Sequence, residues 1–247
     1  MDQNYSAQDV QFSVGSVMGK TFRTIFKNPL LFLGLAAIPT IFLGASSFMQ
    51  FMPSVEVSNV GKALNVLLGI LGVIIQGAVA YAVFESFMGN RVTMGSALSR
   101  AASRTGRLIL LFLSMGLCFC LSALLLFIPV IILTCMWSVA IPSCVIEGLG
   151  VRGSLGRSRQ LTKGYRWKVL ALLSLTGILS FVTALLIIGV FALITYITGN
   201  GIPVIIAALG AWTFAGTMMS VMVGVLYCCL RSVKEGLVSA DLANVFN

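Results

Sequence analysis

The sequence predicts an all-α, polytopic integral membrane protein with six transmembrane helices. Its 247 residues are 58% hydrophobic and only 9% charged, with a mean hydropathy of +1.03, whereas about a quarter of the residues of a soluble domain are charged. Apolar runs long enough to cross a ~30 Å hydrocarbon core recur along the chain. Fifteen of the sixteen Lys and Arg residues lie between these runs, on segments that share one predicted side. This composition excludes a soluble globular domain.

Six apolar runs give the expected spans. We predict helices near 29–50, 63–86, 108–127, 129–147, 169–192 and 204–229. The stretch from Leu108 to Ile146 is too long for one crossing at ~1.5 Å rise per residue, and Pro129 predicts a tight hairpin within it. The first dozen residues carry acidic side chains and no apolar core, so the first run is expected to remain as a span and not as a cleaved signal peptide.

The distribution of cations predicts the orientation. With six spans, Lys62 is the only cation outside, and all the others fall on the inner side; with five spans, Arg100 and Arg159 would face opposite compartments. We therefore expect a bacterial inner-membrane protein with both termini in the cytoplasm. Residues 1–247 form a single membrane domain, which is divided into a cytoplasmic amphipathic segment (1–28), a six-helix bundle (29–230) and a cytoplasmic tail (231–247).

Two basic stretches share one pattern. Residues 14–27 and 94–107 each place an apolar stripe at helical spacing opposite three cations, and Ser13 and Thr93 stand at N-cap positions. We expect interfacial helices there, and a less regular one from Gly153, each preceding one of three hairpins (29–86, 108–147 and 169–229) that should superpose. In the alternative interpretation, the stripes pack on neighbouring helices and the repeat is accidental.

A third basic segment is the candidate site for anionic lipid. It gathers six cations and one tryptophan between residues 152 and 168: Arg152, Arg157, Arg159, Lys163, Arg166, Trp167 and Lys168. Arginine offers planar donors to phosphate, and tryptophan sits at the depth of the head groups. We expect this cluster to be the most exposed one and to contact membrane lipid. The alternative is that these charges only set the topology.

The last apolar run contains a pattern of small residues. Gly216, Ser220 and Gly224 are spaced four apart, which allows two backbones to approach closely, within the monomer or in a homo-oligomer. Packing within the monomer is the favoured interpretation. Glu85 and Glu147 lie near inner helix ends, where pairing with adjacent arginines is favoured over cation binding.

Residues that carry enzyme chemistry are scarce. The chain has no histidine and seven acidic residues, and its six cysteines fall inside apolar runs, where disulfides are not expected. The predicted span interiors contain no Asp, Lys or Arg, which weakens the case for an ion-coupled carrier. We predict no catalytic, cofactor or metal site and no nucleic-acid partner.

Three segments resemble one bacterial membrane-protein family. From Glu147 the chain reads EGLGVRGSLGRSRQLTKGYRWKVLAL, from Phe12 it reads FSVGSVMGKTFRTIFKNPLLFL, and it closes with Tyr227, Leu230-Arg231 and Lys234-Glu235-Gly236. Together these segments resemble the mostly uncharacterised family typified by the membrane domain of some glycerophosphoryl diester phosphodiesterases. Cys229 stands where that family's closing motif has an acidic residue. The resemblance implies six membrane helices and little about mechanism.

These observations lead to two functional hypotheses. The first is a non-enzymatic protein of envelope or lipid physiology, which acts through lipid contact or as a membrane scaffold for a protein partner. The alternative is a transporter or channel for a small or amphipathic solute. A polar groove that reaches the midplane would favour transport, and a solidly packed bundle with a basic inner face would favour the first hypothesis.

Overall fold

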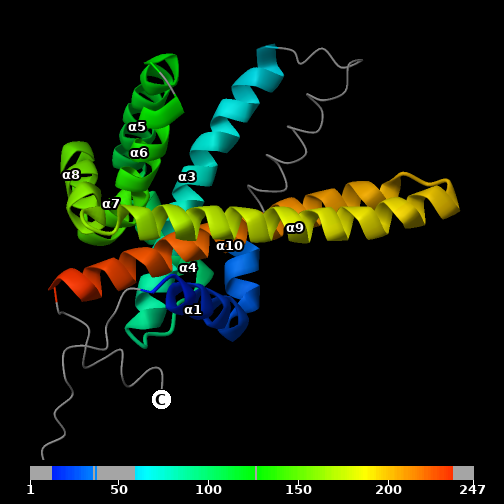
Figure 1. Ribbon diagram of the computed structural model, residues 1–247, viewed down its shortest axis with the longest axis horizontal. Helices are drawn as coiled ribbons and strands as arrows, with labels where there is room; N and C mark the ends of the chain where they lie inside the picture. The colour runs from blue at the N-terminus through cyan, green and yellow to red at the C-terminus, as the bar shows by residue number, and fades with distance from the viewer. Residues whose placement is uncertain (1–12, 36, 38–58, 126, 236–247) are drawn as a thin grey trace, which may run out of the picture.

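The computed structural model describes residues 13–35, 37, 59–125 and 127–235, and these residues form helices and short connections without any strand (Figure 1). The helices are α1 (Val14–Lys27), α3 (Asn59–Phe87), α4 (Met94–Ala102), α5 (Thr105–Leu125), α6 (Phe127–Trp137), α7 (Ala140–Glu147), α8 (Val151–Thr162), α9 (Arg166–Thr198) and α10 (Ile202–Glu235). A further helical segment, 29–35, follows Asn28. The predicted all-α class is confirmed.

Five stretches of the described chain are long and apolar enough to cross a membrane. They are Val66–Phe87, Thr105–Ser122, Pro129–Glu147, Arg166–Thr198 and Ile202–Glu235. The predicted span 29–50 lies largely outside the described residues, since only 29–35 and Ala37 belong to them. The chain therefore carries the apolar helices of a membrane protein.

The predicted break near Pro129 is present. Helix α5 ends at Leu125 and α6 begins at Phe127, and the two helices lie side by side (Figure 1). Pro129 is the third residue of α6, in the first turn, where its missing N–H costs no helical hydrogen bond. The ring centres of Phe119 in α5 and Trp137 in α6 lie 6.0 Å apart, so the run 108–146 is not one continuous helix.

A second break was not predicted. The expected helix 129–147 is interrupted between Trp137 and Ala140, because Pro142 has no N–H for the carbonyl of Ser138 and its ring would clash with that carbonyl. The carbonyl of Met136, at the end of α6, accepts a hydrogen bond of 2.8 Å from Ser158 Oγ of α8. This hydrogen bond joins the end of α6, next to the interruption, to α8.

The last two helices are longer than predicted. We expected 169–192 and 204–229, but α9 has 33 residues and α10 has 34, or ~50 Å each. No proline occurs in α9, and Gly199 ends it in the left-handed conformation (φ +67°) and donates its N–H to the carbonyl of Thr195. Figure 1 shows the pair running side by side and extending beyond the other helices.

The core lies at one end of these long helices. Residues 221–230 of α10 are all buried, and α10 packs against α9, α3 and α1. The distal part of the pair is different: large apolar side chains there face outward, among them Phe181, Leu186, Leu193, Ile197 and Ile206. In a membrane these side chains would meet lipid.

The predicted stripe of α1 faces protein. Val17, Met18 and Ile25 are buried within the cluster that includes the second half of α10, so the alternative interpretation, packing on neighbouring helices, holds for this stripe. Ser13 makes no side-chain cap; its carbonyl accepts a hydrogen bond from Ser16 Oγ instead.

Helix α4 is shorter than the predicted 94–107. Thr93 caps it as expected, in a reciprocal capping box with Ser96, but the helix ends at Ala102. Ser103 Oγ donates to the carbonyl of Arg100, and Thr105 Oγ1 donates to that of Ala102, so side chains satisfy backbone groups at this end. Of the predicted stripe, only Ala97 and Ala101 are buried.

Helix α8 forms despite its irregular apolar spacing. Its buried residues are Ser154, Ser158, Leu161 and Thr162, and the three hydroxyls all donate to backbone carbonyls. Small polar side chains with internal partners therefore replace a hydrophobic stripe here.

Candidate functional site

Glu147 is the last residue of α7, and its position is fixed by the turn that follows. Gly148 adopts a left-handed conformation (φ +72°) and donates its N–H to the carbonyl of Cys144 at 3.1 Å. Arg104 Nη1 donates to the same carbonyl at 3.0 Å. A Cβ atom at residue 148 would lie 2.6 Å from that nitrogen, so the turn requires glycine for its conformation and for space.

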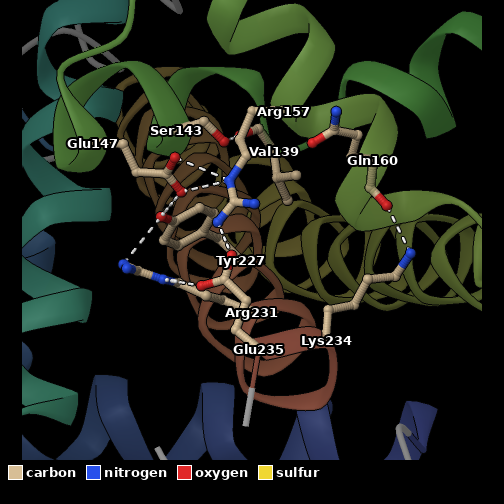
Figure 2. Close-up of polar contacts among 9 residues, drawn as sticks. All are labelled: Val139, Ser143, Glu147, Arg157, Gln160, Tyr227, Arg231, Lys234 and Glu235. Carbon is tan, nitrogen blue, oxygen red and sulfur yellow. Dashed lines mark hydrogen bonds and ion pairs between the residues drawn. The ribbon is translucent and has the colours of Figure 1, made fainter. Parts of the chain in front are cut away.

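Arg157 of α8 joins two carboxylates. Its Nε donates to both oxygens of Glu147 at 2.9 Å, and its Nη2 donates to Glu235 Oε1 of α10 (Figure 2). The three side chains are between 16% and 22% exposed. Burial by itself lowers the pKa of the guanidinium, but the hydrogen bonds with Glu235 and Glu147 outweigh it, and the pKa of Arg157 is raised. Arg157 is therefore charged at any physiological pH.

Helix α10 supplies the other side chains that bind these groups. Tyr227, Arg231 and Glu235 are spaced four residues apart on one face. The Tyr227 hydroxyl donates to Glu147 Oε1 at 2.7 Å, and Arg231 donates to Glu235 Oε2 at 3.0 Å and to the Tyr227 hydroxyl at 3.5 Å. We call these five residues the polar ring: Glu147, Arg157, Tyr227, Arg231 and Glu235. It links α7, α8 and α10, and its two carboxylates balance its two guanidinium groups.

Two further contacts extend the polar ring to neighbouring elements. Lys234 Nζ donates to the carbonyls of Gln160 and Lys163 at 2.7 and 2.8 Å and so caps the end of α8; Figure 2 includes the contact with Gln160. The guanidinium of Arg231 lies 5.8 Å from the ring centre of Phe84 in α3. The polar ring thus holds four helices together.

The side chains of the polar ring bind one another and so have a structural role. Both carboxylates of the polar ring already accept hydrogen bonds from charged partners. Within the described ranges, no three His, Cys, Asp or Glu residues are grouped so that they could hold a metal ion. The favoured prediction for Glu147, pairing with an arginine, is confirmed, whereas Glu85 accepts a hydrogen bond from Asn90 Nδ2 at 2.6 Å.

The predicted lipid cluster is divided by the structure. Arg152 and Arg159 lie seven residues apart on one exposed face of α8, and Lys163, the C-cap residue that follows the helix, is exposed as well; we call these three residues the basic face of α8. Lys168 and Trp167 are also exposed, the latter to 84%. Arg157 points the other way, into the polar ring, and Arg166 is half-buried. The expectation that all six cations form one exposed cluster is therefore corrected for Arg157 and Arg166.

Within the pattern of small residues in α10, Gly224 packs against another helix of the same chain. A Cβ atom on Gly224 would lie 3.0 Å from Val83 Cβ of α3, so the two backbones approach closely at this point. Gly216 and Ser220 are half-buried. The favoured interpretation, packing inside the monomer, agrees with the position of Gly224.

The polar ring itself was not predicted from the sequence. Its signal was present: Tyr227, Arg231 and Glu235 repeat every four residues at the end of an apolar helix, where a row of polar side chains needs partners. The partners, Glu147 and Arg157, come from a distant part of the sequence, and only the fold brings them there.

The described helices include five stretches long and apolar enough to cross a membrane, and the polar ring lies at their polar, basic end. No family model, curated protein or solved structure matches this chain. The family resemblance therefore stays a prediction, although the residues that carry it converge: all five members of the polar ring belong to the segments that begin at Glu147 or close the chain.

Proposed function

We propose that this chain is a non-enzymatic, six-span protein of the bacterial inner membrane that acts in envelope or lipid physiology. It binds anionic lipid at its cytoplasmic face and, through that face, serves as a membrane scaffold for a protein partner. The observation that carries the proposal is the exposed basic face of α8, formed by Arg152, Arg159 and Lys163, next to Trp167 at the start of α9.

The length of α9 supports a membrane-spanning position with this face at the head groups. Trp167 and Tyr196, near its two ends, are 84% and 87% exposed. Aromatic side chains of this kind concentrate at membrane–water interfaces. Residues 167 to 196 cover ~44 Å along the helix, which matches the ~40–45 Å of a bilayer including its head groups. The basic end of α9 then lies in the cytoplasm.

The six-span topology rests on the five apolar stretches and on the predicted span 29–50. The three hairpins 29–86, 108–147 and 169–229 then have their open ends at the cytoplasmic face. A basic helix precedes each hairpin: α1, α4 and α8. Excess Lys and Arg on cytoplasmic segments is the general rule for such proteins.

A transporter or channel is the alternative. Against a pathway between α3 and α10 stands the packing of their basic ends, where residues 221–230 are buried and Gly224 approaches Val83 closely. Against an enzyme stands the use of Glu147 and Glu235 in the polar ring. These observations favour a solid bundle that acts through its surface.

The proposal is tested by replacing Arg152, Arg159 and Lys163 with Gln. Arg157, Arg166 and Lys168 remain, so the polar ring and the positive-inside signal are kept. With ~1 kcal/mol for each cation near an anionic surface, affinity for phosphatidylglycerol should fall by about a hundredfold. The measurements are co-purified anionic lipid and thermal stabilisation by added phosphatidylglycerol.

The matched control exchanges the same three positions with charge retained: Arg152→Lys, Arg159→Lys and Lys163→Arg. It should hold lipid nearly as well as the wild type. Equal lipid retention by the wild type and the Gln variant would contradict the proposal and leave these cations as a topology signal.

A further inference from the structure

A pocket of about 550 Å³ lies on another part of the basic end. It is bounded by the end of α1, the helical segment 29–35, the last turns of α3 and the loop before α4. Its volume is within the ~300–1,000 Å³ of small-molecule sites. None of its lining residues belongs to the polar ring or to the basic face of α8.

Two cations line this pocket from different elements. Lys27 ends α1, and Arg91 lies in the loop between α3 and α4; both side chains are exposed. Within the described part of the chain, neither one makes a hydrogen bond or ion pair. No carboxylate is among the lining residues, and the nearby Glu85 already accepts from Asn90. Among the residues that the structure describes, no carboxylate therefore pairs with either of these two positive charges.

The wall of the pocket changes from polar to apolar along the direction of the spans. Lys27 and Asn28 precede the apolar run that begins at residue 29, and Leu31 and Phe32 follow within it. On the opposite wall, Arg91 lies beyond Phe87, the end of an apolar stretch, and Ala82 lies inside that stretch. Both walls thus place cations at the level where the spans end.

We propose that this pocket binds the phosphate-bearing head group of an anionic phospholipid. Lys27 and Arg91 contact the phosphate, the amide of Asn28 offers a further donor, and the first carbons of an acyl chain lie along Leu31. A cation pair suits a phosphodiester, and an apolar wall continuous with the spans suits the lipid that carries it. The inference rests on the membrane orientation of the proposed function, but on none of its lipid-binding residues.

The test uses the full chain, purified in a neutral detergent and titrated with dioctanoyl phosphatidylglycerol. Native mass spectrometry counts the bound lipids, and thermal unfolding reports stabilisation. The Lys27→Gln/Arg91→Gln variant should lose one tightly bound phosphatidylglycerol, with an affinity about thirtyfold lower. The Lys27→Arg/Arg91→Lys variant should keep it. Both variants should unfold like the wild type without lipid, because the replaced side chains are exposed.

Two further ligands identify the source of the phosphate. Dioctanoyl phosphatidylcholine, whose head group has no net charge, should not compete, and glycerol phosphate should compete only weakly because it lacks acyl chains. If glycerol phosphate or inorganic phosphate stabilises the protein as well as the lipid does, the commitment to lipid is overturned. Unchanged phosphatidylglycerol binding by the Gln pair overturns the site itself.

The triple Gln variant of α8, measured in parallel, separates this inference from the proposed function. Loss of binding in the α8 variant alone overturns the pocket and leaves the proposed function standing. Loss of phosphatidylglycerol binding in the pocket variant alone supports the pocket as the binding site and contradicts lipid binding by the basic face of α8.

Discussion

The two halves of α10 have opposite surroundings. Near its start, Ile202, Ile206 and Trp212 are exposed, whereas residues 221–230 are entirely buried. The buried half contains Gly224, which lets α3 approach, and Tyr227, whose hydroxyl joins the polar ring. Hydrophobicity makes α10 long and apolar enough to cross a membrane, while small residues and paired polar groups decide which half contacts protein.

The same contrast separates α3 from α9. The buried end of α3 is built from small side chains, such as Ala78, Val79 and Ala82, whereas the exposed side of α9 presents Phe181 and Leu186. Close backbone approach needs small residues, and lipid accepts large ones. The predictions below test this division, beginning with the largest effect.

Arg157→Met should have the largest effect on the buried end. It leaves the carboxylates of Glu147 and Glu235 without their shared cation, and unpaired charges in a partly buried site are costly. Because these side chains keep some contact with solvent, we expect the free energy of unfolding to fall by about 2 kcal/mol. Thermal unfolding of the purified protein measures the change.

The matched control is Arg159→Met, on the exposed face of the same helix. It should change the free energy of unfolding by no more than about 0.5 kcal/mol. If the two variants are equally stable, the polar ring does not hold the basic end together.

Gly224→Ala should have a smaller effect, because its new methyl group would lie 3.0 Å from Val83 Cβ. We expect a loss of about 1 kcal/mol in the free energy of unfolding, because Val83 has to shift by only a few tenths of an ångström. Adding Val83→Ala should recover part of it, as a double-mutant cycle would reveal. Gly210→Ala, in the exposed half of the same helix with open space around it, is the control; a loss equal to that of Gly224→Ala would contradict the division of α10.

The elements that depend on local signals were predictable. The capping box at Thr93 and the break near Pro129 each follow from a few neighbouring residues. The extra break before Pro142 was also encoded locally, but the apolar run around it obscured the signal.

The elements that depend on distant partners were not predictable. Arg157 looks in sequence like any other cation of its segment, and only the placement of Glu147 and Glu235 removes it from the exposed cluster. Helix α8 buries Ser158, whose acceptor is the carbonyl of Met136 in α6, so its buried face has no apolar stripe that the sequence could reveal.

Cysteine labelling tests the central claim most directly, namely that the basic end lies in the cytoplasm and the α9–α10 turn outside. Arg159→Cys and Asn200→Cys are each treated with a membrane-impermeant maleimide in intact cells, and the parent chain with its native cysteines gives the background. We predict labelling of residue 200 in intact cells and of residue 159 only after permeabilisation. Labelling of residue 159 in intact cells would contradict the proposed orientation.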